Sequence, residues 1–296
     1  MTASQILADS RKAKIKSVRI GILWMLATTF LFVAQDSTTR VLLQTYPVME
    51  VAWARYFVHV LAAAGFVAWR HPSAAISRRP WLQIARSSLI LAVTLLAALS
   101  IGHMRFVDFT AIIWVTPVLV TALSVFMLHE KVGISGWVSV ALGMTGVLVI
   151  VNPAGIDFSY AMLFPMMGAL TNALYQITTR MLHFADRPLT TFFYTGLVGA
   201  IICSATLPFI GIMPNLHDGF LMLILGALGG ASHYCLIRAF TAAPANVIAP
   251  YGYSSLVWAT LFSLTLFSEV PSFRTMTGAG LIVAGGLFNF LRKRGA

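Results

Sequence analysis

Charged side chains are scarce in this sequence. Of 296 residues only 10% are charged, and nine are Asp or Glu, whereas soluble domains carry about 25% charged residues. Hydrophobic residues make up 58% of the chain, and its mean hydropathy is +0.84. A soluble fold needs a polar surface, which so few polar side chains do not supply. The composition therefore excludes a soluble enzyme and a disordered chain, and it favours a multi-pass membrane protein.

Nucleic acid is excluded as a partner by the placement of the positive charge. The net charge is +11 and the isoelectric point is near 10.2, a balance that often accompanies nucleic-acid binding. Here the basic residues lie at the ends of apolar stretches and not on one polar face. We therefore interpret the charge as a signal of membrane topology.

Cysteine and catalytic motifs are also sparse. Cys203 and Cys235 each fall in an apolar stretch without a CxxC motif, which excludes a disulfide framework and a zinc site. HExxH, GxSxG and P-loop motifs are absent from the sequence, so the chain does not hydrolyse ATP. We expect no enzymatic activity, no cofactor and no metal.

Ten apolar runs are long enough for membrane helices, which need about 20 residues. A basic N-terminal tail, residues 1–17, precedes the first run, which is too long for a cleavable signal peptide. Proline residues mark most of the short connections. The expected spans are 20–39, 49–69, 82–101, 107–128, 134–151, 159–180, 189–210, 217–237, 246–267 and 275–291.

The distribution of Lys and Arg predicts the orientation of these spans. With a cytoplasmic N-terminus, sixteen bases, Arg86 among them, fall at cytoplasmic ends, and Arg55 lies inside a span. Only Arg40, Arg105 and Arg274 fall on the other side. Cytoplasmic loops are enriched in Lys and Arg, so we expect ten spans with both termini cytoplasmic.

A repeat relates the two halves of the chain. A shift of 140 residues places Thr38-Thr39-Arg40 on Thr178-Thr179-Arg180, and a shift of 139 places Glu130 on Glu269 and Gly146 on Gly285. Each half then holds five spans, an odd number, so the second half enters the membrane from the opposite side. Inverted repeats are the architecture of many secondary transporters, whose substrate sites lie near the bilayer midplane.

Several stretches resemble a known family. They are "ARYFV" in the second span, "RFVDFTAIIWVTPVLVTALSVFMLHE", "GWVSVALGMTGVLVIVNP" and "IRAFTAAPANVIAPYGYSSLVWATLFSLTLFSE". Together they resemble the EamA-type branch of the drug/metabolite transporter superfamily over residues of about 18 to 293. Thr195 departs from the pattern, because the repeat would place the counterpart of Arg55 there.

The resemblance implies an all-α membrane protein of ten transmembrane helices, built as two inverted five-helix repeats over residues 18–153 and 157–293. It also implies a secondary carrier in the bilayer of the bacterial inner membrane that moves a small organic solute by alternating access. Amino acids, amines, vitamins and nucleotide-like solutes are the expected cargo classes. Direction, coupling and oligomeric state stay open, with a homodimer as one alternative.

Ionisable residues inside a span are candidate functional sites, since charge in a bilayer is costly. We expect Asp36 to bind an amine or a proton, and Arg55 to bind a carboxylate; the alternative is a structural ion pair between them. His59 lies one helical turn after Arg55. It is a second candidate for proton coupling, or a hydrogen-bonded packing residue.

Further candidates come from spans 4, 6 and 9. Asn172, Tyr175 and Gln176 are expected to line the cavity or to bridge helices. Aromatic residues lie either in an interfacial belt or in a cavity wall that stacks on planar or cationic cargo. Tyr251 and Trp258, seven residues apart, are expected on one helical face. The aromatic candidates are Trp114, Tyr251, Tyr253 and Trp258.

Two rival classes stay open. A membrane-embedded enzyme is favoured only by His103 and Asp108, an H-x4-D spacing in a short connection. A channel or structural subunit could also carry ten spans, and saturable uptake would separate it from a carrier. Glu130 and Glu269 are expected to cap a turn or to pair with a nearby base such as Lys131 or Arg274, with a role in gating as the alternative.

Overall fold

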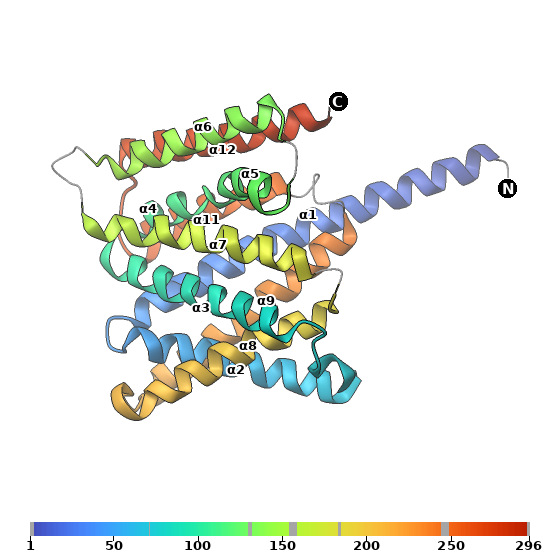
Figure 1. Ribbon diagram of the computed structural model, residues 1–296. Helices are drawn as coiled ribbons and strands as arrows, with labels where there is room; N and C mark the ends of the chain where they lie inside the picture. Colours follow the sequence, from blue (N-terminus) through green and yellow to red (C-terminus); the bar gives the residue numbers. More distant parts are fainter. Residues whose placement is uncertain are drawn as a thin grey trace.

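The computed structural model describes residues 3–70, 72–129, 132–153, 159–182, 185–243 and 249–294. Every regular element in these ranges is a helix (Figure 1). The α-helices are α1 (Ala3–Leu42), α2 (Val48–Arg70), α3 (Pro80–His103), α4 (Phe106–Ile113), α5 (Thr116–Met127), α6 (Ile134–Val151), α7 (Leu163–Leu182), α8 (Pro188–Ile210), α9 (Leu216–Ala242), α11 (Ser254–Leu266) and α12 (Phe273–Arg294). The short 3-10 helices are η1 (Pro72–Ala75), η2 (Tyr160–Met162) and η3 (Ala249–Tyr253).

These helices follow the apolar runs of the sequence. The fourth run forms two helices, α4 and α5, because Pro117 lacks the N–H that would continue one helix through Trp114 and Val115. Among the described residues, six segments are long and apolar enough to cross a membrane. They are Ser17–Leu42, Val48–Trp69, Pro80–His103, Phe106–Met127, Pro188–Ile210 and Leu216–Leu236. Shorter apolar stretches lie in α6 and α12.

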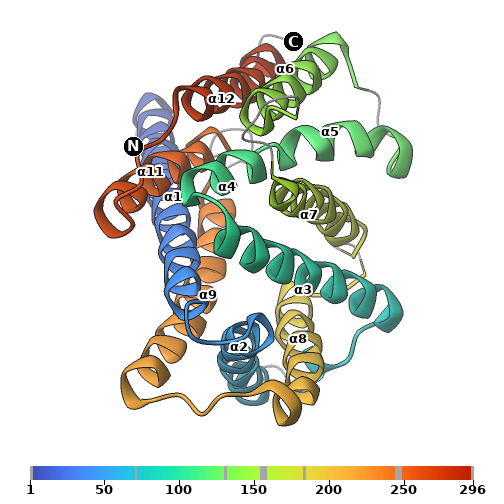
Figure 2. The ribbon, with the colours of Figure 1, turned by 90° about the vertical axis from the view of Figure 1, so that its left-hand side faces the viewer.

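Helices of the two halves pack against one another in pairs. α1 packs against α9, α3 against α7, α2 against α8, and α6 against α12 (Figures 1 and 2). The 140-residue shift superposes α1 on α7 and α3 on α9. The contact of α1 with α9 therefore has its counterpart in the contact of α7 with α3.

Glycines let α6 and α12 approach closely. A Cβ on Gly146 would lie 2.6 Å from the carbonyl oxygen of Gly278, and one on Gly285 would lie 3.1 Å from that of Ser139. Small residues allow such close backbone contact between membrane helices. The 139-residue shift exchanges these two pairs, since it takes Gly146 to Gly285 and Ser139 to Gly278.

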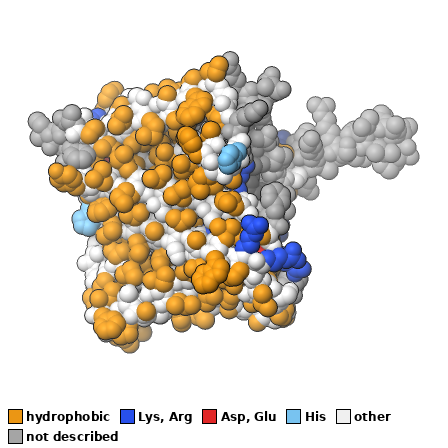
Figure 3. All heavy atoms as spheres, viewed as in Figure 1, with side chains coloured by type: hydrophobic (Ala, Val, Ile, Leu, Met, Phe, Trp, Pro, Cys, Tyr) orange, Lys and Arg blue, Asp and Glu red, His pale blue; other side chains and the backbone are white. Residues whose placement is uncertain are grey.

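Apolar side chains cover the outer surface. Figure 3 shows hydrophobic side chains over most of the visible face, with Lys and Arg gathered mainly at its right-hand edge. Large side chains such as Phe209, Leu223 and Val257 are exposed. A soluble monomer rarely exposes a continuous apolar surface of this kind, so this surface fits a lipid environment.

Gly278→Ala should destabilise the α6–α12 pair, because its methyl group would lie 2.5 Å from both the Gly146 carbonyl oxygen and Ile150 Cγ1. Overpacking of this kind costs about 1–3 kcal/mol. Gly280→Ala, on the same helix, is the matched control, because a Cβ there meets no atom within 4 Å among the described residues. Thermal unfolding of detergent-purified protein gives the melting temperature of each variant. Equal melting temperatures for the two variants would contradict the close α6–α12 contact.

Candidate functional site

An arginine from α3 lies buried between helices of both halves. The Arg86 side chain is only 3% exposed. Its Nε donates to Thr179 Oγ1 (2.8 Å), its Nη1 to Thr195 Oγ1 (2.7 Å) and to the Thr191 carbonyl oxygen (3.2 Å), and its Nη2 to Tyr175 Oη (2.5 Å). The sequence counted Arg86 among the bases at cytoplasmic ends. Its side chain is not exposed there but is enclosed by α3, α7 and α8.

A cavity of about 220 Å³ lies beside this arginine. Its walls come from α2, α3, α7, α8 and α9 and from the connection before α8. The cavity thus lies between helices of the two halves. Residues that line it include His59, Arg86, Tyr175, Asp186, Thr191 and His233.

His59 faces this cavity from α2. The side chain is buried, and its Nε2 lies 3.1 Å from the Phe192 carbonyl oxygen, an acceptor, so Nε2 donates there. Its ring centroid lies 4.2 Å from that of Phe192 and 6.1 Å from that of His233. Close packing depends on Gly196 of α8, where a Cβ would lie 2.7 Å from His59 Cδ2. The hydrogen bond fits the packing role, and the cavity position fits a functional one.

Asp36 and Arg55 belong to a second polar group, where α1, α2 and α9 meet. Both are half-buried, and the positive charge of Arg55 acts on the Asp36 carboxylate. Gln35 is buried, and its Oε1 has no hydrogen-bond partner among the described residues. Gly229 of α9 leaves room for this group, since a Cβ there would lie 3.1 Å from Gln35 Oε1 and 3.7 Å from Arg55 Cγ.

Of the polar candidates on α7, Tyr175 contacts Arg86 directly. Tyr175 accepts a hydrogen bond from Arg86, whose guanidinium carbon lies 4.5 Å from the tyrosine ring centroid. Asn172 and Gln176 are half-buried one turn apart on the same helix. The structure therefore joins Tyr175 to the cavity through direct contacts.

The aromatic candidates do not form one cluster in the structure. Trp114 and Tyr253 meet, with ring centroids 5.2 Å apart. Trp258 packs instead on Phe30, with centroids 5.5 Å apart. Tyr251 lies in η3, before α11 begins, and is 40% exposed. The spacing of seven residues therefore does not place Tyr251 and Trp258 on one α-helical face, because the α-helix begins only at Ser254.

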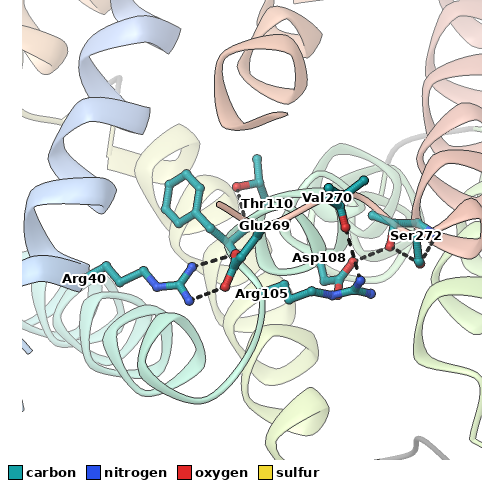
Figure 4. Close-up of polar contacts among 9 residues, drawn as sticks. Arg40, Arg105, Asp108, Thr110, Glu269, Val270 and Ser272 are labelled. Atoms are coloured by element: carbon teal, nitrogen blue, oxygen red, sulfur yellow. Dashed lines mark hydrogen bonds and ion pairs between the residues drawn. The ribbon is translucent and has the colours of Figure 1, made fainter. Parts of the chain in front are cut away.

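Glu269 ties together three parts of the chain at one end of the bundle. It receives hydrogen bonds from Arg40 Nη1 (2.9 Å) and Nη2 (2.5 Å) at the end of α1, and from the Phe106 amide (3.0 Å) at the start of α4 (Figure 4). The Arg40 guanidinium carbon also lies 4.4 Å from the Phe267 ring centroid. Glu269, expected to cap a turn or to pair with a nearby base such as Arg274, thus forms an ion pair with Arg40. Glu130 and Lys131 lie outside the described residues.

The pKa of Glu269 reflects these contacts. Burial alone would raise the pKa, but the Arg40 hydrogen bond, the Phe106 amide and the charges of Arg40 and Arg105 outweigh it and lower the pKa below its usual value. The carboxylate is therefore ionised at neutral pH.

The His103–Asp108 pair does not form a dyad in the structure. Asp108 instead accepts hydrogen bonds from Arg105 Nε (2.7 Å) and from Thr275. Arg105 and Asp108 lie side by side in Figure 4. The His103 Nδ1 lies 2.8 Å from the Leu99 carbonyl oxygen. Both residues border an open pocket of about 560 Å³ at the Glu269 end, but their contacts are structural.

Asp186 ties together the opposite end of the bundle. It accepts hydrogen bonds from Ser77 Oγ (2.5 Å), the Arg78 amide (2.8 Å) and Gln83 Nε2 (2.8 Å), which join the α2–α3 and α7–α8 connections. Burial alone would raise the pKa of Asp186, but these hydrogen bonds and the charge of Arg78 lower it below its usual value. Each end of the bundle thus has a carboxylate that holds parts of both halves together, and at the Glu269 end Asp108 also does so through Thr275.

Comparison with known proteins identifies the family. The sequence model of the EamA-like transporter family matches residues 19–152 and again residues 159–291.

This chain belongs to the EamA-like transporter family. It is 26% identical over 274 residues to the S-adenosylmethionine uptake transporter of Rickettsia bellii, and the aligned region covers 93% of this chain and 94% of that protein. It is 24% identical over 276 residues to the riboflavin transporter of Rhizobium johnstonii, with 91% and 90% covered. A solved crystal structure has a TM-score of 0.63 at 16% identity, covering 94% of this chain and 98% of that chain, and it shows the fold alone.

The EamA-family chain is therefore a multi-pass membrane transporter of a small metabolite, and not an enzyme.

Sequence reasoning missed Arg86 and Asp186 as parts of the site. A signal for Arg86 was available, because it is the fifth residue of the apolar run 82–101. For Asp186 no comparable signal exists, because an acidic residue in a short connection has no expected partner.

The Arg40–Glu269 ion pair should behave as one unit in a double-mutant cycle. Arg40→Gln and Glu269→Gln should each lower the free energy of unfolding by about 1.5–3 kcal/mol, the range for hydrogen bonds to charged groups. Gln at 269 keeps an acceptor for the Phe106 amide. The free energy of unfolding of the double variant should be little lower than that of either single variant. Unfolding of detergent-purified protein measures these free energies.

The same pair should show a defined pH dependence. Because the folded-state pKa of Glu269 is lowered, its stabilisation is present above the ordinary glutamate pKa of about 4.3 and is lost as the pH falls below it. The stability difference between wild type and Glu269→Gln should therefore vanish in acid. Additive single effects, or a difference unchanged by acid, would contradict the ion pair.

Proposed function

We propose that this EamA-family protein carries a zwitterionic, nucleoside-linked solute such as S-adenosylmethionine across the bacterial inner membrane by alternating access. The observation that carries the proposal is the similarity to the S-adenosylmethionine uptake transporter of Rickettsia bellii over nearly the full length of both chains. Similarity of that extent includes the helices of both halves, and with them every element around the cavity.

The polar and aromatic side chains supply the chemistry that such a solute needs. S-adenosylmethionine carries an ammonium group, a sulfonium group, a carboxylate and a planar adenine. Asp36 offers a carboxylate to the cationic groups, and aromatic rings offer stacking and cation–π contacts. The proposed solute-binding set is Asp36, Arg55, Trp114, Asn172, Tyr175, Gln176, Tyr251, Tyr253 and Trp258, with Asp36 and His59 as candidates for proton coupling.

We propose that ten spans form two inverted repeats, residues 18–153 and 157–293. The exchanged helix contacts and glycine pairs support this arrangement. His129 and Ser268, which the 139-residue shift superposes, both have a left-handed backbone, with φ of 53° and 54°. The Trp114–Tyr253 contact joins two further positions related by the same shift.

Orientation follows from the basic residues. Without Arg86, fifteen bases still fall on the side of the termini and three on the other, so we place both termini in the cytoplasm. Glu269 then ties the outer end and Asp186 the inner end. Alternating access requires that one of these two contacts opens while the other holds.

A flavin is the second candidate cargo, favoured by the similarity to the riboflavin transporter of Rhizobium johnstonii. The Trp114–Tyr253 ring pair fits a planar aromatic solute. Riboflavin differs from S-adenosylmethionine in carrying no carboxylate and no fixed positive charge, so one assay separates the two.

Purified protein in liposomes should take up labelled S-adenosylmethionine with saturable kinetics and should exchange it for unlabelled solute inside. Riboflavin should compete weakly. Empty liposomes and liposomes with an unrelated membrane protein are the controls. Non-saturable flux would favour a channel, and riboflavin uptake without S-adenosylmethionine uptake would overturn the cargo proposal.

Asp36→Asn should remove the pH dependence of this uptake, because the amide cannot take up a proton. Initial rates across a pH series in liposomes measure the effect, and a wild-type melting temperature shows that the variant is folded. An Asp36→Asn profile parallel to that of wild type would overturn the role of Asp36 in proton coupling.

A further inference from the structure

Arg86 carries a buried positive charge whose hydrogen-bond partners are all neutral. It bonds two threonine hydroxyls, a tyrosine hydroxyl and a backbone carbonyl. Thr179 and Thr195 donate their own hydroxyl protons to carbonyl oxygens one turn earlier, so each faces the guanidinium as an acceptor. Among the described residues, no carboxylate lies within ion-pair distance of Arg86. A buried charge is normally paired.

Arg55 provides an internal comparison. It also lies inside a span, and its charge acts on the Asp36 carboxylate. Arg55 thus interacts with a carboxyl group of the protein, whereas no carboxylate among the described residues lies within ion-pair distance of Arg86. An ion pair with an anionic group of the cargo would therefore stabilise Arg86 more than Arg55.

The surroundings of Arg86 leave a place for that group. Its five N–H donors make four hydrogen bonds, and the fifth, on Nη2, has no partner among the described residues. The guanidinium borders the cavity of about 220 Å³. The charged or titratable side chains that share the cavity are His59, Tyr175, Asp186 and His233.

We propose that Arg86 is an anion subsite of this cavity that binds the carboxylate of the transported solute. This deepens the proposed function and rests on it. A carboxylate is a monoanion and matches the single charge of Arg86. A phosphate dianion would bring one negative charge more than Arg86 neutralises, in a cavity where Asp186 is already ionised. The subsite thus selects amino-acid-like cargo and gives a neutral flavin nothing to pair with.

The test compares two solutes that differ only in the carboxylate, S-adenosylmethionine and decarboxylated S-adenosylmethionine. Their KM values for uptake into liposomes are measured with wild type, Arg86→Gln and Arg86→Lys. Wild type should prefer the carboxylate form by about tenfold or more, since sites built to bond a polar group discriminate against analogues that lack it. Arg86→Gln should raise KM for S-adenosylmethionine alone and bring the ratio near one. Arg86→Lys should retain part of the preference.

Arg79→Gln is the matched control, because Arg79 is an exposed arginine at the same end and does not line the cavity. It should keep the wild-type ratio. A wild type that carries both solutes equally would overturn the anion subsite but leave the transport function standing. A wild type that carries neither would overturn the proposed cargo. If Arg86→Gln does not fold, the wild-type ratio and Arg86→Lys decide the question.

Discussion

Burial of the Arg86 guanidinium is the constraint on which the arrangement of the surrounding helices depends. A charged group loses its hydration when it is enclosed, and the loss is offset only if acceptors are placed around it. Here α7 supplies Tyr175 and Thr179, while α8 supplies Thr191 and Thr195. These acceptors fix α3, α7 and α8 relative to one another and leave the cavity on the open side of the guanidinium.

The same contacts join the two halves of the transporter. Arg86 comes from the first half, and its acceptors come from the second. One of them, Thr195, stands at the position where the repeat lacks a counterpart of Arg55. Glu269 and Asp186 then link the halves at opposite ends. In a carrier, the links at the ends must break and form in turn, and Asp186 also lines the cavity proposed to hold the cargo.

The sequence predicted the helices well, because apolar runs of about 20 residues have few alternatives in a membrane. The expected ion pair of Asp36 with Arg55 stays a prediction, although the charge of Arg55 acts on Asp36. Partners far apart in the chain were not predictable. Glu269 pairs with Arg40, which is far away in the sequence, and Arg86 is buried although the distribution of basic residues counts it at a cytoplasmic end. Hydropathy records the length of a span but not which face of it meets another helix.

The most direct test of the account is an experimental structure of the protein with S-adenosylmethionine bound. The account predicts that the solute lies in the cavity between the halves, with its carboxylate within hydrogen-bond distance of the Arg86 guanidinium. Its cationic end should point toward the α1–α2 side, where Asp36 lies. A solute bound with its carboxylate at Arg55, or held in the pocket at the Glu269 end with Arg86 still bonded only to Tyr175 and the threonines, would contradict the account.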